Sequence, residues 1–203
     1  MSEEDMDKVI FLGEAGVGKT NLINITMGIA FNDQEAATSS ASFSTKKISV
    51  RGKDYPIKLW DTIGQEKFRT LTKLFYTNAK IAIFVYDITQ KDTFEEIKNY
   101  WVKDVEEKLG KDIIKGIVAN KIDLFMKEQI TQEEGEEYAK SIGALFLSIS
   151  AKADNPKKFE ELLTKLYEKY LTKIGDNQPD HKKIIIKNQK KGKANCMHGV
   201  KIC

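Results

Sequence analysis

The sequence predicts an α/β fold in which a mostly parallel sheet of six strands, with one antiparallel edge strand, carries helices on both faces. Two observations support this prediction. Short apolar runs of strand length alternate with helical patterns along the chain, and this alternation is typical of a parallel sheet covered on both sides. One pair of neighbouring strand patterns is joined by a short turn, which adds the antiparallel edge strand.

Each strand is predicted from a run of apolar or alternating residues. In chain order the runs cover residues 8–12, 43–50, 55–60, 81–86, 116–119 and 145–149. A turn at residues 51–54 joins the second and third runs. Residues 32–42 are polar and show no periodicity, so we expect a loop there.

The helices are predicted from their start signals and their apolar faces. Asp92 and Glu95, and likewise Thr131 and Glu134, have the spacing of a capping box. Asn155-Pro156 supplies an N-cap followed by proline at the first helical position. We expect a first helix over residues 21–27 and a last helix over about residues 156–171. The apolar stripe of the last helix consists of Phe159, Leu162, Leu163, Leu166 and Tyr170.

The charge distribution divides the chain in two. Residues 173–203 hold eight lysines against Asp176 and Asp180, a net charge of +6, and the whole chain carries +3, so residues 1–172 carry −3. Apolar periodicity stops after residue 172. We therefore expect a folded domain over residues 1–172 and a disordered, lysine-rich tail over residues 173–203. An acidic body with two arginines, Arg51 and Arg69, argues against nucleic acid as a partner.

The cysteines and the hydropathy pattern exclude further classes. Cys196 and Cys203, the two cysteines, both lie in the tail, which argues against a disulfide framework or a zinc finger and for a reducing, cytosolic compartment. No run of apolar residues is long enough to span a bilayer. The acidic N-terminal residues lack the pattern of a secretory signal.

Residues 13–20 carry the strongest motif. Gly13, Gly18, Lys19 and Thr20 have the spacing of a P-loop, directly after a predicted strand and before a predicted helix. Glycines allow the backbone N–H groups to wrap a polyphosphate at a helix N-terminus. Lys19 is expected to neutralise the β- and γ-phosphates, and the Thr20 hydroxyl to bind Mg²⁺. The motif therefore predicts the three-layer fold of the P-loop NTPases.

Three further motifs each follow a predicted strand. Asp61-Thr-Ile-Gly64 supplies a carboxylate for the metal and an N–H for the γ-phosphate. In Asn120-Lys121-Ile122-Asp123, the Asp123 carboxylate can accept from N1–H and the exocyclic amine of guanine, a pair that adenine does not offer. The N–H of Ala151 in Ser150-Ala151-Lys152 can donate to guanine O6. Each motif alone is a common polar turn, but their order predicts a guanine nucleotide and excludes an ATP-using kinase.

With these motifs in place, residues 7–172 resemble a small GTPase of the Ras superfamily, and more narrowly a Rab. The resemblance extends to Lys58-Leu-Trp-Asp-Thr-Ile-Gly-Gln-Glu66, Lys67-Phe-Arg-Thr-Leu-Thr72, Phe75-Tyr-Thr-Asn-Ala79 and Phe84-Val-Tyr-Asp-Ile-Thr89. The segments at residues 41–47 and 101–105 are most similar to the endosomal branch.

The resemblance implies a role for individual residues. Lys19, Thr38 and Gln65 are then the catalytic residues, with Gln65 orienting the attacking water and Thr38 meeting the metal and the γ-phosphate in the GTP state alone. Phe31 packs edge-on against guanine. Thr20, Thr38 and Asp61 form the metal site. Nucleotide contacts come from Gly13, Glu14, Ala15, Gly16, Val17, Gly18, Lys19, Thr20, Asn21, Phe31, Thr38, Gly64, Asn120, Lys121, Asp123, Ser150, Ala151 and Lys152.

The resemblance further implies that Phe43, Trp60 and Phe75 present a surface to effectors; ordinary core packing is the alternative for Trp60 and Phe75. The implied partners are guanine nucleotide, effectors, an exchange factor and a GTPase-activating protein, and the chain is expected to be a monomer. No arginine lies in the phosphate-binding or switch I segments, so we expect slow GTP hydrolysis that an activating protein accelerates by roughly 10³–10⁵.

The chain departs from the family at several positions. Ile63 stands where the family usually has alanine, beside Gln65, and a larger side chain there favours slower hydrolysis. Ala15 replaces the glycine that Ras has, and residues 38–43 replace a commoner switch I sequence. Two hypotheses follow: a GTP/GDP switch acting in vesicle trafficking, and a hydrolysis-deficient GTP-binding scaffold. Ile63 supports the scaffold, and Gln65 supports the switch.

The C-terminal residues predict how the protein reaches a membrane. Rabs usually end in paired prenylated cysteines, but this chain ends Asn195-Cys-Met-His-Gly-Val-Lys-Ile-Cys203. Lipidation of Cys203, with Cys196 as a second site, is expected to act together with the tail lysines at an anionic surface. The implied location is the cytoplasmic face of intracellular membranes, in exchange with the cytosol. The alternative is a solvated tail with two incidental cysteines.

Overall fold

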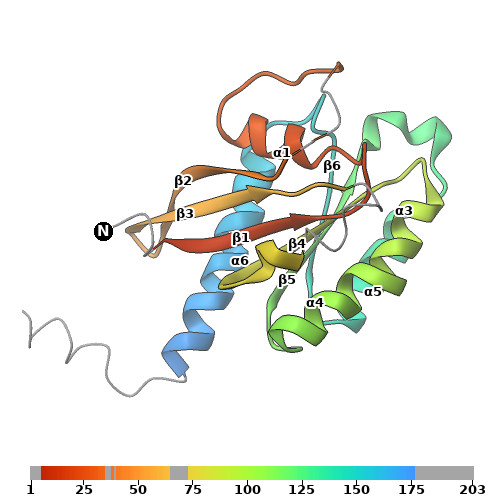
Figure 1. Cartoon of the computed structure of the whole chain (residues 1–203). Coiled ribbons are helices and arrows are strands. Elements are labelled where there is room, and N and C mark those ends of the chain that lie inside the picture. The colour runs from red at the N-terminus through yellow and green to blue at the C-terminus, as the bar shows by residue number, and fades with distance from the viewer. Residues whose placement is uncertain (1–5, 35–37, 39, 65–72, 177–203) are drawn as a thin grey trace, which may run out of the picture. The chain divides into compact units, whose positions relative to one another are not determined.

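The computed structural model describes residues 6–34, 38, 40–64 and 73–176. Its centre is a six-stranded sheet with the strand order β2-β3-β1-β4-β5-β6 (Figure 1). Every neighbouring pair is parallel except β2 and β3. The strands are β1 (Asp7–Leu12), β2 (Ser42–Val50), β3 (Lys53–Asp61), β4 (Ala79–Asp87), β5 (Ile114–Asn120) and β6 (Leu145–Ile149). The predicted fold class, with its antiparallel edge strand, is confirmed.

Helical segments connect the strands. They are α1 (Lys19–Thr26), the 3₁₀ turn η3 (Lys73–Tyr76), α3 (Lys91–Glu96), the π-helical turn η4 (Ile97–Trp101), α4 (Val102–Leu109), the 3₁₀ segment η5 (Ile122–Lys127), α5 (Gln132–Ser141) and α6 (Lys157–Asp176). Segments α3, η4 and α4 follow one another without a break.

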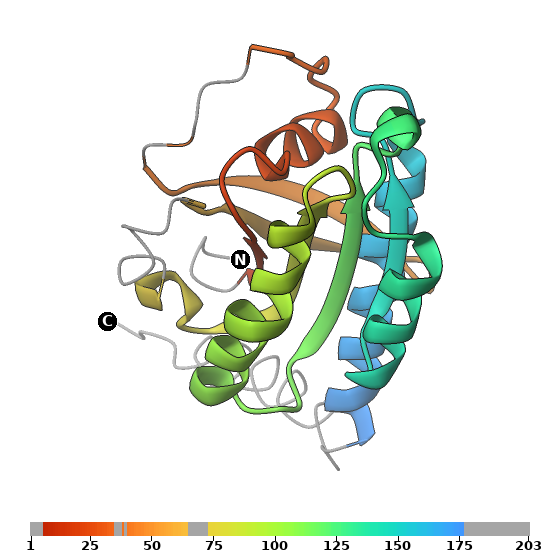
Figure 2. The same cartoon turned by 90° about the vertical axis from the view of Figure 1, so that its right-hand side faces the viewer.

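The helices cover both faces of the sheet (Figure 2). On one face, residues of α3, η4, α4 and α5 join β4 and β5 in a single apolar cluster that contains the fully buried Trp101. On the other face, Lys46 of β2 donates to the Thr26 carbonyl of α1 at 2.7 Å and pairs with Glu160 of α6 at 2.7 Å. Phe11 and Phe159 pack with ring centroids 5.9 Å apart on that face.

Two of the three predicted helix starts are confirmed. Thr131 and Glu134 form a capping box, in which each side chain accepts from the backbone N–H of the other residue. The Asn155 side chain accepts from the N–H of Lys157 at 3.0 Å.

The third start and the last helix end differ from the prediction. The box at Asp92 and Glu95 is wrong: α3 begins at Lys91 with Gln90 as its cap, because the chain turns earlier, where the Thr93 hydroxyl donates to the Gln90 carbonyl. Helix α6 continues to Asp176, past the predicted end at residue 171, so helical hydrogen bonding extends beyond the apolar stripe.

Parallel strands place their carboxyl ends at one edge of the sheet, and the loops that follow β1, β4, β5 and β6 meet there. Among the described residues no helix has the length and apolar character needed to cross a membrane.

Candidate functional site: a nucleotide pocket at the strand ends

A cavity of about 490 Å³ lies at the carboxyl edge of the sheet. Its lining residues come from the P-loop, the segment after α1, the end of β3 and the loops after β5 and β6. They are Ala15, Gly16, Gly18, Lys19, Thr20, Asn21, Phe31, Asn32, Asp33, Thr38, Gly64, Asn120, Lys121, Asp123, Leu124, Ala151 and Lys152. Fourteen of these seventeen residues are predicted nucleotide contacts, and the structure brings them together around one space.

The P-loop packs so closely that two of its positions require glycine. A Cβ atom at Gly13 would lie 2.2 Å from the Val85 carbonyl oxygen, and one at Gly18 would lie 2.3 Å from Nδ2 of Asn120. Both residues also have positive φ angles, of 138° and 97°. The P-loop therefore packs tightly against β4 and the last residue of β5.

Lys19 lies buried at the centre of this loop. Its Nζ donates to the carbonyl oxygens of Gly13 at 2.8 Å and Glu14 at 2.9 Å. Burial lowers the pKa of Lys19 to about 8, while the carboxylates of Asp61 and Glu14 oppose that shift. A desolvated ammonium held by backbone carbonyls is ready to exchange them for phosphate oxygens, which are stronger acceptors.

Three oxygen-bearing side chains converge beside Lys19 from separate parts of the sequence. The hydroxyl oxygens of Thr20 and Thr38 lie 2.9 Å apart. Oδ2 of Asp61 accepts from the Thr20 hydroxyl at 2.6 Å and from the Thr38 hydroxyl at 3.4 Å. Among the described residues no group of three or more His, Cys, Asp or Glu side chains forms a metal cluster. One carboxylate with two hydroxyls is a hard, oxygen-only donor set, which fits Mg²⁺ shared with phosphates and water.

Gly64 brings the end of the β3 segment against the P-loop. A Cβ atom at this position would lie 2.5 Å from Nζ of Lys19 and 2.6 Å from the backbone nitrogen of Ala15. The preceding Ile63 is buried. Gln65, the predicted water-orienting residue, and the motif at residues 67–72 lie outside the described residues, so the prediction that Ile63 affects Gln65 stays a prediction.

Asn120 joins the two halves of the pocket. Its Nδ2 donates to the Val17 carbonyl at 2.8 Å, and its Oδ1 accepts from the Ala151 N–H at 3.1 Å. The Ala151 N–H, for which we expect guanine O6 as acceptor, is thus bonded to Asn120 in this structure. Asn120 is 1% exposed, so its amide acts as a buried clamp between the P-loop and the loop after β6.

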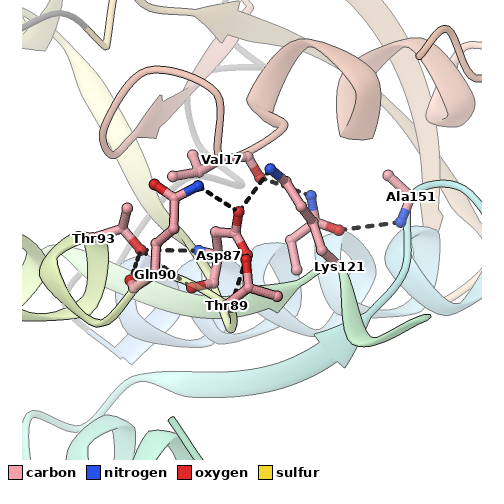
Figure 3. A network of polar contacts seen from close by, with 8 residues as sticks. Val17, Asp87, Thr89, Gln90, Thr93, Lys121 and Ala151 are labelled. Atoms are coloured by element: carbon pink, nitrogen blue, oxygen red, sulfur yellow. Dashed lines mark hydrogen bonds and ion pairs between the residues drawn. The ribbon is translucent and has the colours of Figure 1, made fainter. Parts of the chain in front are cut away.

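The lysine and the aspartate of the same motif are also fixed by neighbours. Oδ1 of Asp123 accepts from the Ser150 hydroxyl at 2.6 Å. Lys121, which has a positive φ of 67°, places its Nζ 2.7 Å from Oδ2 of the buried Asp87 (Figure 3). Asp87 in turn accepts from the N–H and hydroxyl of Thr89 at 2.8 and 2.7 Å. The Lys121 stem is therefore held in one orientation at the cavity wall.

Lys152 and Phe31 meet at the open side of the pocket. The Lys152 ammonium lies 5.7 Å from the centre of the Phe31 ring and bonds both carboxylate oxygens of Asp33, at 3.1 and 2.9 Å. The hydrogen bond to Asp33 raises the pKa of Lys152. The Asn21 side chain bonds the backbone of Asn32 in both directions at 3.2 Å. These contacts tie the segment after α1 to both α1 and the loop after β6.

Some predicted residues do not line the cavity, and some lining residues are not predicted. Gly13, Glu14, Val17 and Ser150 stand behind the lining residues; the Glu14 carboxylate accepts from the indole N–H of Trp101 at 2.9 Å. Asn32, Asp33 and Leu124 line the cavity without a prediction. None of the three belongs to a motif, although Leu124 directly follows Asp123 and Asp33 lies two residues after Phe31.

The three aromatic residues expected to meet effectors form one continuous cluster. The ring centroids of Phe43 and Trp60 are 5.2 Å apart, and those of Trp60 and Phe75 are 5.5 Å apart. Phe43 is 41% exposed. Trp60 also packs against the apolar cluster beneath α3 and α4, so core packing and surface presentation both apply to it.

Comparison with known proteins decides the family. Residues 8–172 match the model of the Ras family. Human Ras-related protein Rab-21 is 43% identical over 164 residues, which cover 81% of this chain and 72% of that protein. The chain belongs to the Rab branch of the Ras family. Rab-21 of Dictyostelium discoideum is 42% identical over 159 residues, covering 78% of this chain and 74% of the relative. Rab-8B of Pongo abelii is 36% identical over 173 residues, covering 85% and 82%.

Family membership settles the general activity. This Rab binds guanine nucleotides, hydrolyses GTP to GDP and phosphate, and acts with regulators and effectors in membrane trafficking. The scaffold hypothesis is not favoured. The predicted Rab resemblance, over residues 7–172, is confirmed almost to the residue by the family match.

Proposed function

We propose that this Rab is a Mg²⁺-dependent switch whose GTP state is built by joining Thr38 and Gly64 to the P-loop. The observation that carries the proposal is the convergence of Thr20, Thr38 and Asp61 within hydrogen-bond distance. Thr38 lies on the segment between α1 and β2, and Asp61 ends β3. A ligand that needs all three oxygens therefore couples two loops that are otherwise separate.

Each side chain has a defined part in holding the nucleotide. The P-loop N–H groups surround the β-phosphate, and Lys19 exchanges its carbonyl acceptors for phosphate oxygens. Asp123 accepts from the guanine edge while Ser150 holds its other oxygen, and Lys121 covers the base. Thr20 and Thr38, with Asp61 beside them, would hold Mg²⁺, which would supply positive charge to the phosphates. Gln65 orients the attacking water, and loss of the γ-phosphate releases Thr38 and Gly64.

We propose that hydrolysis is slow in the isolated protein. Arg51, the arginine among the described residues, lies in the β2–β3 turn and pairs with Glu168 at 2.9 Å, away from the cavity. A charge supplied by an activating protein is then worth roughly 10³–10⁵ in rate. For membrane attachment we propose lipidation of Cys203, with Cys196 as a second site, together with the tail lysines, on the cytoplasmic face of intracellular membranes.

The first test is the nucleotide that the purified protein carries. Denaturation followed by chromatography is expected to release GDP at one equivalent, because bound GTP turns over during purification. Release of GTP would contradict turnover, and absence of guanine nucleotide would contradict tight binding. Single-turnover hydrolysis, measured with and without Mg²⁺, then tests the metal requirement; equal rates would overturn it.

The lipid proposal has a separate test. Intact mass of the protein isolated from its own cells is expected to show an added prenyl mass, and Cys203→Ser is expected to remove it and to shift the protein to the soluble fraction. Two unmodified cysteines in the membrane-bound protein would contradict the proposal.

A further inference from the structure

A second pocket, of about 380 Å³, opens away from the nucleotide site beside Trp60. It is lined by residues of β1, β3 and β4, by the residue before β1 and by the turn before β4: Met6, Asp7, Lys8, Lys58, Trp60, Thr77, Asn78 and Lys80. None of these residues lines the nucleotide cavity. Neither the motifs nor the nucleotide chemistry gives this pocket a role.

Three lysines, each partly buried, surround this pocket. Lys8 and Lys58 are register partners on the adjacent parallel strands β1 and β3. Lys80 lies on β4, the strand on the other side of β1. Burial, and then the neighbouring charge of Lys58, lower the pKa of Lys8. Holding three cations in partial shelter from water is costly unless an anion joins them.

The described part of the chain does not provide that anion. Among the described residues, the ammonium groups of Lys8, Lys58 and Lys80 form no ion pair with a carboxylate. Asp7 also lines the pocket, but Tyr167 and Tyr170 of α6 donate to its two carboxylate oxygens at 2.6 and 3.3 Å. That carboxylate therefore serves the opposite face of the sheet.

The lysines belong to the same surface as the aromatic cluster. Nζ of Lys8 lies 4.0 Å from the centre of the Trp60 ring, and Nζ of Lys58 lies 4.8 Å from that of Phe43. Thr77 and Asn78 follow directly after η3, which carries Phe75. An apolar patch bordered by a cationic pocket matches a partner that presents apolar side chains next to acidic ones.

We propose that the pocket formed by Lys8, Lys58 and Lys80 binds carboxylate side chains of a protein partner that docks on Phe43, Trp60 and Phe75. This inference rests on the proposed use of the aromatic cluster as an effector surface. The pocket is built mainly on β-strands and away from the nucleotide cavity, so it is expected to be present in both nucleotide states. The pocket then selects the partner, and the switch segments make the binding of that partner depend on GTP.

The test uses succinate, a dicarboxylate, as the probe and the Trp60 indole as the reporter. Trp60 lines the pocket, and its indole N–H has no acceptor among the described residues. We therefore expect the NMR signal of this N–H to shift when an anion binds in the pocket. The full chain, loaded with GDP and labelled at tryptophan nitrogen, is titrated at constant ionic strength. Trp60→Phe identifies the signal. We expect a saturable shift, with an affinity about fivefold weaker in Lys8→Gln and in Lys58→Gln.

A matched control and one alternative anion make the result decisive. Lys53→Gln removes the same charge from an exposed lysine of β3 outside the pocket, and it is expected to leave succinate affinity unchanged. Absence of saturation, or equal weakening in Lys53→Gln, would overturn the proposal. So would preferential binding of inorganic phosphate over succinate, which would indicate a phosphorylated ligand.

The acidic residues that precede Met6 are another source of carboxylates. If the pocket already holds them, the triple variant Glu3→Gln, Glu4→Gln, Asp5→Asn shifts the Trp60 signal without any ligand and strengthens succinate binding, which would overturn the assignment to a partner. An unchanged signal supports it. The GDP content of each variant is measured in parallel, so failure of the pocket is distinguishable from failure of the nucleotide switch.

Discussion

The base side and the phosphate side of the nucleotide cavity differ in how their polar groups are held. On the base side, the side chains of Asn120, Lys121 and Asp123 bond to Val17, Asp87 and Ser150, respectively. Contacts within the protein therefore already hold these side chains in place. On the phosphate side, Lys19 donates hydrogen bonds to carbonyl oxygens of its own loop. The base side is thus preformed. On the phosphate side, a bound ligand would replace the hydrogen bonds that Lys19 makes within its own loop.

This difference matches the demands of a switch. Guanine is common to GTP and GDP, so its recognition gains from fixed groups that lose no conformational freedom on binding. The γ-phosphate distinguishes the two states, so the groups that meet it must respond.

The largest expected effect comes from breaking the preformed side. Asn120→Ala leaves the Val17 carbonyl and the Ala151 N–H without their partner in a buried position, which costs roughly 2–4 kcal/mol. We expect GDP to dissociate about 10²-fold faster or more, and the apoprotein to unfold at lower urea. Stopped-flow release of a fluorescent GDP and urea titration measure the two effects. Asn99→Ala, an exposed position on η4, is the control; equal effects in both variants would contradict the clamp.

A smaller and ligand-dependent effect is expected on the phosphate side. Asp61→Asn removes the carboxylate from the three-oxygen cluster while keeping its shape. GDP dissociation in Mg²⁺ is expected to rise about tenfold toward the rate in EDTA, since charge is the main contribution of Asp61. EDTA should then have little further effect on the variant. If EDTA accelerates release equally in both proteins, Asp61 does not take part in the metal site.

The bond between Trp101 and Glu14 ties the phosphate side to the apolar cluster that contains α3 and α4. Trp101→Phe removes the donor to the Glu14 carboxylate and leaves a space where the larger indole was, at a combined cost of about 2–3 kcal/mol. We expect nucleotide release to accelerate by roughly five- to tenfold, because Glu14 also offers its carbonyl to Lys19. An unchanged release rate with lowered stability would show that the bond serves the core alone.

The smallest effect is expected at the rim. Lys152 and Asp33 are exposed, and water and salt screen an exposed ion pair so that it contributes little. Lys152→Ala is expected to accelerate GDP release by no more than about fivefold, with a further decrease in effect at high salt. A double-mutant cycle with Asp33→Ala isolates the pair; a coupling well above that limit would mean that the rim, too, is preformed.

Local signals predicted the fold and most of the residues that line the cavity. The strand runs, the P-loop glycines and the Thr131 capping box depend on neighbours in sequence, and all appear as expected. Asp92 was wrong as a cap because the competing turn at Gln90 forms a helix start two residues earlier. The sequence pattern alone also placed the end of α6 too early, since helical hydrogen bonding outlasts the apolar stripe.

The missed residues depend on contacts between distant segments. Asp33 lines the pocket because Lys152 holds it, across 119 positions of sequence. Asp87 fixes Lys121 from the end of a different strand, and Trp101 reaches Glu14 from a π-helical turn. For Asp87, the signal available in the sequence was a carboxylate directly after a predicted strand. For Trp101, which lies in the middle of the continuous helical segment from Lys91 to Leu109, the indole donor gave no indication of its acceptor.

Amide hydrogen exchange of the protein loaded with GDP and with a non-hydrolysable GTP analogue tests the central claim most directly. We predict that residues 38–43 and 61–64 gain protection in the GTP-analogue state, while residues 120–123 and 150–152 are equally protected in both. Equal changes on both sides of the cavity, or a change confined to the base side, would contradict the division into a preformed and a responsive half.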